Sequence, residues 1–331
     1  MLLRSEDISI GITVYRRLDY LEQALGSAMN QTVPVRVRLY DDGCDDRDRL
    51  QRILQPYGDR VQYQRNTGPH GLFHNMNRCI WESPTPWVSV LHDDDLLATD
   101  FVERILTVAH EVGDCALFCG GSIYIDTEGR PYHRMGPPPD TRWRRLTAVD
   151  FAHRTWFPFP GHLLRVQTAQ AAGGFPIKSL YTGDWELWFQ LALAGGAVQL
   201  GADLGYHRVH HGADRGTTAA AKTGRKTALC AMQAKRNFSR LQRRGMNIVF
   251  DRRAWTKEHG PMYRDLLIYA GKMPRWLLRY NRRMLLLANP PGRLSQIMQT
   301  ISRLFGNPGI RLASLARALA ERCGVKMRPT F

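Results

Sequence analysis

Residues 8–95 alternate between strand-like and helix-like patterns, and this alternation limits the folds that the chain can adopt. β-Rich runs are separated by segments whose apolar residues recur at helical spacing. The pattern favours an α/β fold, with a mostly parallel sheet flanked by helices. The first strand leads into Thr13-Val14-Tyr15-Arg16-Arg17 without a G-x-G-x-x-G pattern, which argues against a hydride-transferring dehydrogenase. The predicted strands are Ile8–Val14, 35–40, 61–64 and the run from Trp87, and the predicted helices are 18–28, 46–54 and 71–81.

The apolar run that begins at Trp87 ends in three consecutive carboxylates, Asp93, Asp94 and Asp95. Neighbouring carboxylates repel each other, so a fold gains nothing from them unless they share a cation. Mg²⁺ and Mn²⁺ take oxygen ligands, usually one or two carboxylates plus substrate phosphates. Because open α/β sheets bind ligands at the carboxyl ends of their strands, the triplet is a candidate site for a metal-bound nucleotide. The alternatives are an acidic loop, or a helix N-cap in which Asp95 caps a helix that begins near Thr99.

Composition predicts a folded protein without a membrane span. The chain has 331 residues, 44% of them hydrophobic, which is enough for a sizeable core. Its N-terminus lacks the apolar core of a signal peptide, and no apolar run approaches the ~20 residues that a spanning helix needs. The six cysteines are scattered without a CxxC pair, so we expect free thiols and a cytoplasmic location.

The positive charge of the chain is concentrated at its C-terminal end. Residues 225–331 hold 23 Lys and Arg against 4 Asp and Glu, whereas residues 1–224 hold 23 against 26. This asymmetry predicts an anionic partner, either nucleic acid or anionic lipid. Residues 276–287 interleave Arg with Trp and Leu, as in an interfacial amphipathic helix, and no nucleic-acid recognition motif is visible. The alternative is a set of helices that pack on the N-terminal part of the chain and expose a basic face.

The second half of the chain contains fewer clear signals. Residues 115–125 are predicted to form a buried strand, and Asp126-Thr127-Glu128-Gly129 a hairpin turn. Residues 184–194 are predicted to form a strongly apolar helix. Beyond residue 216 we expect helices with basic faces, broken by Pro and Gly.

Five motifs, in their order along the chain, resemble the inverting GT-A glycosyltransferases of family 2, which build surface glycans. The resemblance covers about residues 7–215. It implies a GT-A nucleotide-sugar-binding domain at 1–215, with a nucleotide-binding half at 1–112 and an acceptor half at 113–215. Residues 216–331 form an α-helical, basic C-terminal region outside it. The motifs are 8–15, Asn30-Gln31-Thr32, 39–46, the His92–Asp95 cluster, and Gly183-Asp184-Trp185-Glu186-Leu187-Trp188.

The resemblance assigns nucleotide-binding roles to residues after the first two strands. Thr13 and Tyr15 lie where relatives hold the base, and Asp42 matches the acid that accepts a hydrogen bond from a ring nitrogen, with Asp41 beside it. The alternative for Asp41-Asp42-Gly43 is a simple turn.

The triplet matches the ribose and metal positions of the family. Asp93 matches the residue that touches the ribose, and Asp94 is the main candidate ligand for Mn²⁺ or Mg²⁺, with Asp95 as a second. The usual pattern is D-x-D, and here His92 stands at its first acidic position. An imidazole can ligate Mn²⁺ itself or orient a ligand from behind.

Asp184 resembles the catalytic base. A carboxylate is needed there because an acceptor hydroxyl must lose its proton as it attacks the anomeric carbon. Relatives often have Glu before this Asp, whereas this chain has Gly183. Glu186 is a candidate acceptor-side residue. The alternative for Asp184 is a helix cap.

Histidines supply the remaining candidates. His210, in Tyr206-His207-Arg208-Val209-His210-His211, resembles an element that closes over the diphosphate and metal. His162 is a candidate for the acceptor cleft, with a structural histidine as the alternative. Gly71 stands where some relatives have a diphosphate-binding Arg, which leaves Arg65, His70 and His74 as candidates.

These assignments imply an inverting, metal-dependent glycosyltransferase that uses a UDP- or dTDP-sugar and a glycan or lipid-linked acceptor. With the basic region, they predict peripheral attachment to the inner face of the membrane through residues 225–331. One rival is a sugar nucleotidyltransferase, which needs a Gly-rich, basic loop after the first strand. The other is a non-enzymatic nucleic-acid-binding protein, which leaves the Asp triplet and Asp184 without a purpose.

Overall fold

The computed structural model describes residues 3–210 and 225–249. The chain divides into two units, Met1–His211 and Gly212–Phe331, and each is described by itself. The predicted domain boundary at 215/216, the predicted amphipathic helix at 276–287 and residue His211 lie outside the described residues. None of the helices within the described residues has the length and apolar character that crossing a membrane requires.

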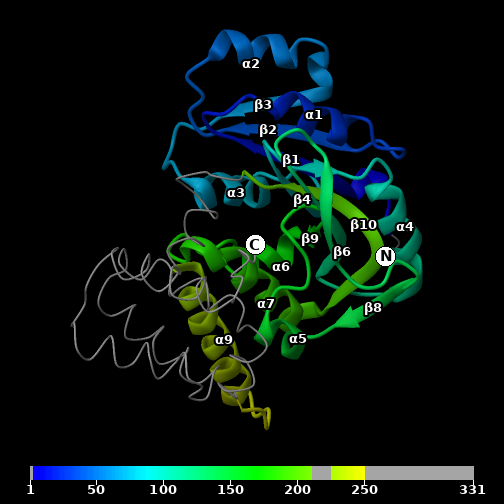
Figure 1. Cartoon of the computed structure of the whole chain (residues 1–331), viewed down its shortest axis with the longest axis vertical. Coiled ribbons are helices and arrows are strands. Elements are labelled where there is room, and N and C mark those ends of the chain that lie inside the picture. Colours follow the sequence, from blue (N-terminus) through cyan, green and yellow to red (C-terminus); the bar gives the residue numbers. More distant parts are fainter. Residues whose placement is uncertain (1–2, 211–224, 250–331) are drawn as a thin grey trace, which may run out of the picture. The chain divides into compact units, whose positions relative to one another are not determined.

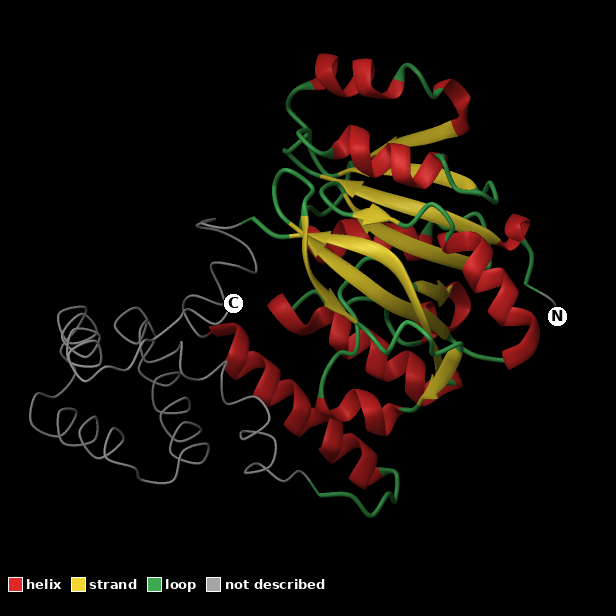
Figure 2. Ribbon diagram, turned by 45° about the vertical axis from the view of Figure 1, so that its right-hand side comes forward, coloured by secondary structure: helices red, strands yellow, loops and turns green. Residues whose placement is uncertain are grey.

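A mixed sheet forms the centre of the first unit (Figures 1 and 2). Over the described residues it has ten strands, in the order β3-β2-β1-β4-β9-β6-β10-β5, with β7 on β6 and β8 on β10. Strands β3, β2, β1 and β4 are parallel, and β6 is parallel to β10. Because β9 is antiparallel to both β4 and β6, all six of these strands run in one direction. The strands are β1 (Ile8–Val14), β2 (Arg36–Asp41), β3 (Val61–Arg65), β4 (Trp87–His92), β5 (Leu96–Leu97), β6 (Leu117–Ile125), β7 (Pro131–Met135), β8 (Trp143–Leu146), β9 (Leu163–Arg165) and β10 (Ala197–Arg208).

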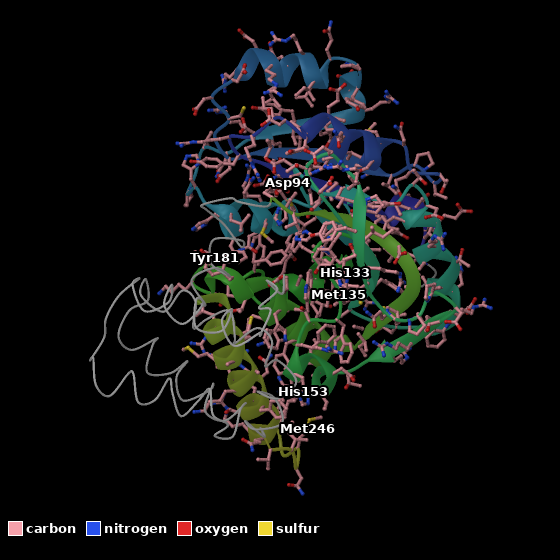
Figure 3. The ribbon with its side chains drawn as sticks, in the orientation of Figure 1. Asp94, His133, Met135, His153, Tyr181 and Met246 are labelled. Atoms are coloured by element: carbon pink, nitrogen blue, oxygen red, sulfur yellow. The ribbon has the colours of Figure 1, made fainter. Side chains whose placement is uncertain are left out.

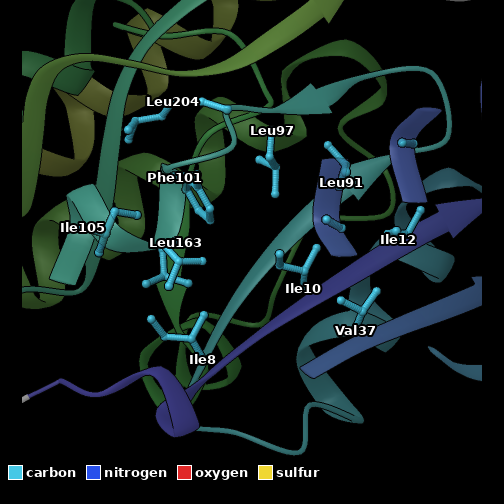
Figure 4. Packing of buried hydrophobic residues seen from close by; sticks show 14 of the residues in the cluster. Ile8, Ile10, Ile12, Val37, Leu91, Leu97, Phe101, Ile105, Leu163 and Leu204 are labelled. Carbon is cyan, nitrogen blue, oxygen red and sulfur yellow. The ribbon is translucent and has the colours of Figure 1, made fainter. Parts of the chain in front are cut away.

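Helices cover both faces of the sheet, so the predicted α/β class is confirmed. Alternate residues of β1 point to opposite faces, as in any strand. Ile8, Ile10 and Ile12 join the core that α1 and α4 complete on one face (Figure 4). On the other face, a Cβ atom at Gly11 would lie 2.8 Å from the sulfur of Cys79 in α3, so glycine permits this close approach. The helices are α1 (Leu21–Met29), α2 (Arg47–Leu54), α3 (Leu72–Trp81), α4 (Phe101–Val112), α5 (Ala148–His153), α6 (Val166–Ala171), α7 (Gly183–Gly195) and, in the second unit, α9 (Arg225–Arg243).

The helix after the Asp triplet does not begin where the N-cap alternative required. Helix α4 starts at Phe101, and Asp100 occupies its N-cap position. Asp95 therefore caps no helix, and the N-cap alternative is wrong.

Helix α9 is the described part of the second unit. Its 19 residues include six basic and no acidic side chains. Ala231, Ala234, Phe238 and Leu241 are buried, and their spacing of three and four residues places them on one face. The helix is therefore amphipathic and basic, as predicted for this region.

The described cysteines are free thiols. Four of them lie in the first unit and are buried, and Cys230 lies in α9. The four buried cysteines are Cys44, Cys79, Cys115 and Cys119.

Candidate functional site

The carboxyl ends of β1, β4 and β10 meet at one edge of the sheet, where the candidate residues gather. Strand β1 pairs with β4 so that Thr13 lies opposite His92, and the chain then continues to Arg17 and to Asp94. The Asp94 carboxylate (Oδ2) is 2.9 Å from His210 Nε2, just beyond β10, and 2.7 Å from Arg17 Nη2. In Figure 3, Asp94 lies between the blue N-terminal strands and the green elements that follow. The structure thus brings the two predicted residues Asp94 and His210 together.

The two adjacent carboxylates Asp93 and Asp94 ionise differently. Burial and the charge of Asp94 raise the pKa of Asp93 to about 7. Burial also opposes the ionisation of Asp94, but the hydrogen bond from His210 and the charges of His92 and Arg17 outweigh it, so the pKa of Asp94 is lowered. A like-charged pair in which one member ionises readily and the other reluctantly is what mutual repulsion produces. A bound cation would stabilise the second negative charge.

Asp95 has a structural role, which corrects its prediction as a metal ligand. Its side chain is 1% exposed. The carboxylate accepts hydrogen bonds from the backbone N–H of Arg208 at 2.8 Å and from His207 Nδ1 at 3.2 Å. Because these bonds tie the loop after β4 to β10, Asp95 holds the scaffold rather than a cation.

The donor set fits a hard divalent cation that is completed by substrate. Two ligands bound side by side, each about 2.1 Å from an octahedral metal, lie about 3 Å apart. Asp94 Oδ2 and His210 Nε2, which are hydrogen-bonded at 2.9 Å, are near enough to bind one cation together. Within the described part of the chain no group of three or more His, Cys, Asp or Glu residues could hold a metal. A cation bound by these two residues would take further ligands from phosphate oxygens and water, as is usual for Mg²⁺.

The carboxylates of Asp41 and Asp42, at the end of β2, differ in the hydrogen bonds that they already accept. Asp41 accepts four, from Gly43 N–H, Cys44 N–H, the Tyr63 hydroxyl and Arg65. A carboxylate has about four acceptor positions, so Asp41 is saturated.

Asp42 retains capacity for a ligand. Its Oδ1 accepts from Asn66 at 2.6 Å and from His70 at 3.1 Å, and its Oδ2 accepts from Gly71 N–H at 2.7 Å. One acceptor position on Oδ2 is left, since a carboxylate offers about four. Asp42 therefore fixes the loop before α3 through its hydrogen bonds, and it can also accept one hydrogen bond from a bound ligand.

Tyr15 and Thr13 occupy different environments. The Tyr15 ring is 47% exposed, and a Cβ atom at Gly43 would lie 3.8 Å from it, so the ring borders the Asp42 turn. Thr13 is buried, and its hydroxyl contacts His92 Nδ1 at 3.2 Å. Tyr15 is thus open to a base, whereas the Thr13 hydroxyl links β1 to β4, and its nucleotide contact stays a prediction.

Asp184 lies in the first turn of α7, beyond the N-cap residue Thr182. It accepts a hydrogen bond from Trp185 N–H at 2.8 Å. Burial lowers the pKa of His92, and the charges of Asp95, Asp94 and Asp184 oppose this shift. A Cβ atom at Gly183 would lie 2.4 Å from the ring of Phe73 in α3. The departure from Glu at this position therefore has a physical cause, since Phe73 fills the space.

His162 and Glu186 are held by protein contacts. His162 is fully buried, donates from Nδ1 to the Phe159 carbonyl at 2.6 Å, and accepts at Nε2 from Val90 N–H at 3.3 Å. Both ring nitrogens are satisfied, so the acceptor prediction for His162 is corrected to its structural alternative. Glu186 is buried and accepts from Gln190 at 2.9 Å, one helical turn away. The structure gives no support to an acceptor role for Glu186.

The candidate diphosphate-binding residues are mostly engaged elsewhere. Arg65 binds Asp41, and His70 binds Asp42. His74 lines a cavity of about 320 Å³ together with Arg65, Asn66 and Arg78, beside β3. Arg208 is buried, and its guanidinium donates to the backbone carbonyls of Asp94, Asp126 and Thr127 and to Gln23. It therefore fixes the backbone at Asp94.

Sequence reasoning missed Arg17 and two asparagines. Asn75 in α3 donates to the Tyr40 carbonyl at 2.8 Å, and Asn66 donates to Asp42. Asn66, directly after a strand and two residues before Gly68, carried a turn signal that was available. Nothing in the sequence separates Arg17 from Arg16.

Comparison with known proteins places the chain in a family. Residues 9–169 match the sequence profile Glycosyl transferase family 2. An uncharacterised glycosyltransferase of Rickettsia typhi is 26% identical over 194 residues, 55% of this chain and 58% of that protein. The chondroitin synthase of Pasteurella multocida is 24% identical over 212 residues, 62% of this chain and 21% of the synthase. The chain thus spans 58% and 21% of the lengths of these relatives.

Solved structures share the fold. Residues 1–349 of S. aureus TarS, crystallised with UDP, give a TM-score of 0.52 at 13% identity, covering 89% of this chain and 91% of that one. The mannosyltransferase PcManGT from Pyrobaculum calidifontis, in complex with GDP-Man and Mn²⁺, gives 0.55 at 16% identity, covering 98% and 84%. Sequence profile and fold agree, and we conclude that this chain carries a family 2 glycosyltransferase domain with the GT-A fold.

Proposed function

We propose that the protein is an inverting, metal-dependent glycosyltransferase that moves a sugar from a UDP- or dTDP-sugar to a glycan or lipid-linked acceptor. The observation that carries this proposal is the meeting of Asp94 and His210 at the carboxyl edge of the sheet. A cation held by these two residues, together with a carboxylate base for which Asp184 is the candidate, would supply what glycosyl transfer from a nucleoside diphosphate requires.

Each residue has a defined task in this mechanism. Asp184 accepts the proton of the acceptor hydroxyl while that oxygen attacks the anomeric carbon from the face opposite the diphosphate. Asp94 and His210 would hold Mn²⁺ or Mg²⁺, which when bound offsets the charge of the departing diphosphate. Asp93, beside them, is the candidate ribose contact.

The hydrogen-bond capacity of Asp42 supports a pyrimidine nucleotide. Its single remaining acceptor position suits one ring N–H, such as the imide of uracil or thymine. The corresponding edge of guanine presents a ring N–H and an amino group together, which one acceptor position cannot satisfy. The exposed ring of Tyr15 beside Gly43 offers a surface on which a base can stack.

The relatives support a nucleotide-sugar donor and differ in its nucleotide. TarS has been crystallised with UDP and with UDP-GlcNAc, whereas PcManGT is in complex with GDP-Man and Mn²⁺. Chondroitin and hyaluronan synthases of Pasteurella multocida are among the similar sequences, which favours a glycan acceptor.

The basic C-terminal region supports a membrane partner. Helix α9 is amphipathic and carries six basic and no acidic residues. We therefore propose a cytoplasmic protein that attaches to the inner face of the membrane through residues 225–331. Anionic lipid adds ~1 kcal/mol for each nearby Lys or Arg.

Two rival functions are disfavoured. A sugar nucleotidyltransferase needs a Gly-rich basic loop after the first strand, and residues 15–20 contain no glycine. A non-enzymatic nucleic-acid-binding protein would leave the Asp94–His210 pair without a purpose.

Thermal unfolding with nucleotides tests the proposal. UDP or dTDP with Mn²⁺ should raise the melting temperature of the protein, because a ligand stabilises the state that binds it. GDP should have a smaller effect. Asp94→Ala should abolish the Mn²⁺-dependent part of the shift and sugar transfer, while Asp19→Ala, which removes an exposed carboxylate paired with Arg49, should preserve both. A full Mn²⁺-dependent shift and normal transfer in Asp94→Ala would refute the metal assignment.

A further inference from the structure

Arg17 lies in the connection between β1 and α1 and binds the residues that are proposed to hold the cation. Its Nη2 is 2.7 Å from Asp94 Oδ2 and 4.0 Å from Asp93 Oδ1, and its Nη1 is 3.2 Å from His210 Nε2. The guanidinium thus pairs with Asp94 and also lies within reach of Asp93.

Arg17 and a divalent cation compete for the same oxygen. Asp94 Oδ2 has two partners, Arg17 Nη2 and His210 Nε2, and a cation bound to both Asp94 and His210 would take the place of the second contact and leave Arg17 beside it. A cation about 2.1 Å from this oxygen could not share it with a guanidinium at 2.7 Å, since the two positive charges would repel. Binding of the cation therefore requires Arg17 to leave Asp94.

Arg17 is free to move, because its side chain is 52% exposed and lies in a loop. If Arg17 leaves Asp94 without finding a new partner, the protein loses an ion pair. A nucleoside diphosphate brings new negative charge to the same edge of the sheet, where phosphate oxygens offer the bidentate geometry that arginine prefers. The loss is then offset only when cation and diphosphate arrive together.

We propose that Arg17 is a positioning residue that couples cation binding to diphosphate binding: it holds Asp94 in the donor-free protein and passes to the diphosphate when the cation takes its place. The inference rests on the proposed function, because it needs a cation at Asp94 and His210. Coupling of this kind is reciprocal, so each ligand should tighten the binding of the other by the same factor.

Mn²⁺ titrations test the coupling without measuring activity. Free Mn²⁺ is followed by its electron paramagnetic resonance signal, with and without UDP, in the full-length protein and its variants. Arg17→Gln should tighten Mn²⁺ binding without UDP about fivefold, the value of a partly exposed ion pair, and should reduce the tightening by UDP about fivefold or more. Arg17→Lys, which keeps the charge, should retain most of the coupling.

Arg49→Gln is the matched control. It removes the same charge and breaks an exposed ion pair with Asp19, in the same β1–α1 connection, without touching Asp94. Its Mn²⁺ affinity and its coupling to UDP should equal those of the wild type.

The outcomes separate this inference from the proposed function. Wild-type binding of Mn²⁺ and UDP, together with unchanged or weaker Mn²⁺ binding in Arg17→Gln without UDP, overturns the role of Arg17 and leaves the function standing. A wild-type protein that binds neither Mn²⁺ nor UDP contradicts the proposed function, and the inference is then wrong as well.

Discussion

Identical neighbouring residues have different roles in this protein, and hydrogen-bond capacity separates them. Asp41 already accepts four hydrogen bonds, whereas Asp42 accepts three and keeps one position. Asp95 binds the backbone of β10, whereas the Asp94 carboxylate binds Arg17 and His210. The sequence predicted both acidic clusters. It could not rank their members, because most of the partners lie 22 to 116 positions away in the sequence.

At the scale of one residue, Asp184→Asn should retain donor binding and lower turnover by ~10² or more, because general-base catalysis contributes roughly 10²–10⁴. The side chains are nearly isosteric, so the fold should persist. Donor binding is measured by titration with UDP, and turnover by product formation. Asp140→Asn, in an exposed loop, serves as the control and should keep full turnover.

The stereochemistry of the product gives an independent check on Asp184. A base that activates the acceptor requires an inverted anomeric centre, which nuclear magnetic resonance of the product reports. Retention of configuration would contradict the assignment, whatever the activity of the variant.

At the scale of elements, the sequence predicted strands β1, β2, β3, β4 and β6 and missed β5, β8, β9 and β10. Every residue of β1 is buried, so its apolar run was visible, and α7 was predicted to within one residue at each end. Strand β10 was missed because glycines and Asp203 interrupt its apolar pattern, although it pairs with β6, β8 and β5. Strands β5, β8 and β9 have two to four residues, too few for a periodic signal.

His162 joins two elements and gives a pH-dependent prediction. It ties the turn before β9 to β4 in its neutral form, and burial lowers its pKa to about 4. In the unfolded chain a histidine has a pKa of about 6.5, so between about pH 6.5 and 4 the unfolded state binds more protons. Lowering the pH through this range therefore destabilises the folded state, by on the order of 2 kcal/mol at pH 5.

Denaturant unfolding at pH 7 and pH 5 measures this effect. His162→Gln keeps one donor and one acceptor but cannot titrate, so it should lose less stability than the wild type between the two pH values. The difference between the unfolding free energies of His162→Gln and the wild type at pH 7 measures the effect of the substitution itself. Equal losses in the two proteins would mean that His162 is not the titrating group.

At the scale of the whole molecule, charge divides the chain. Residues 1–224 carry 23 basic and 26 acidic side chains, and residues 225–331 carry 23 and 4. The acidic residues at the carboxyl edge of the sheet and the basic region therefore occupy separate parts of the sequence. A negative lipid surface would attract the second part without competing for the first.

The full-length protein should accordingly sediment with liposomes that contain phosphatidylserine and remain in solution with purely phosphatidylcholine ones. Charge attraction is screened over about 10 Å at about 0.1 M salt, so higher salt should weaken the binding. Replacing Arg279, Arg282 and Arg283 with Gln should lower the partition about 100-fold, since each arginine contributes ~1 kcal/mol. Replacing Arg47, Arg49 and Arg52 of α2 instead removes the same charge from the first unit and should change little. If the two triple variants weaken binding equally, net charge alone drives it. The membrane proposal is overturned if the protein binds nucleic acid tightly at moderate salt and does not bind anionic liposomes.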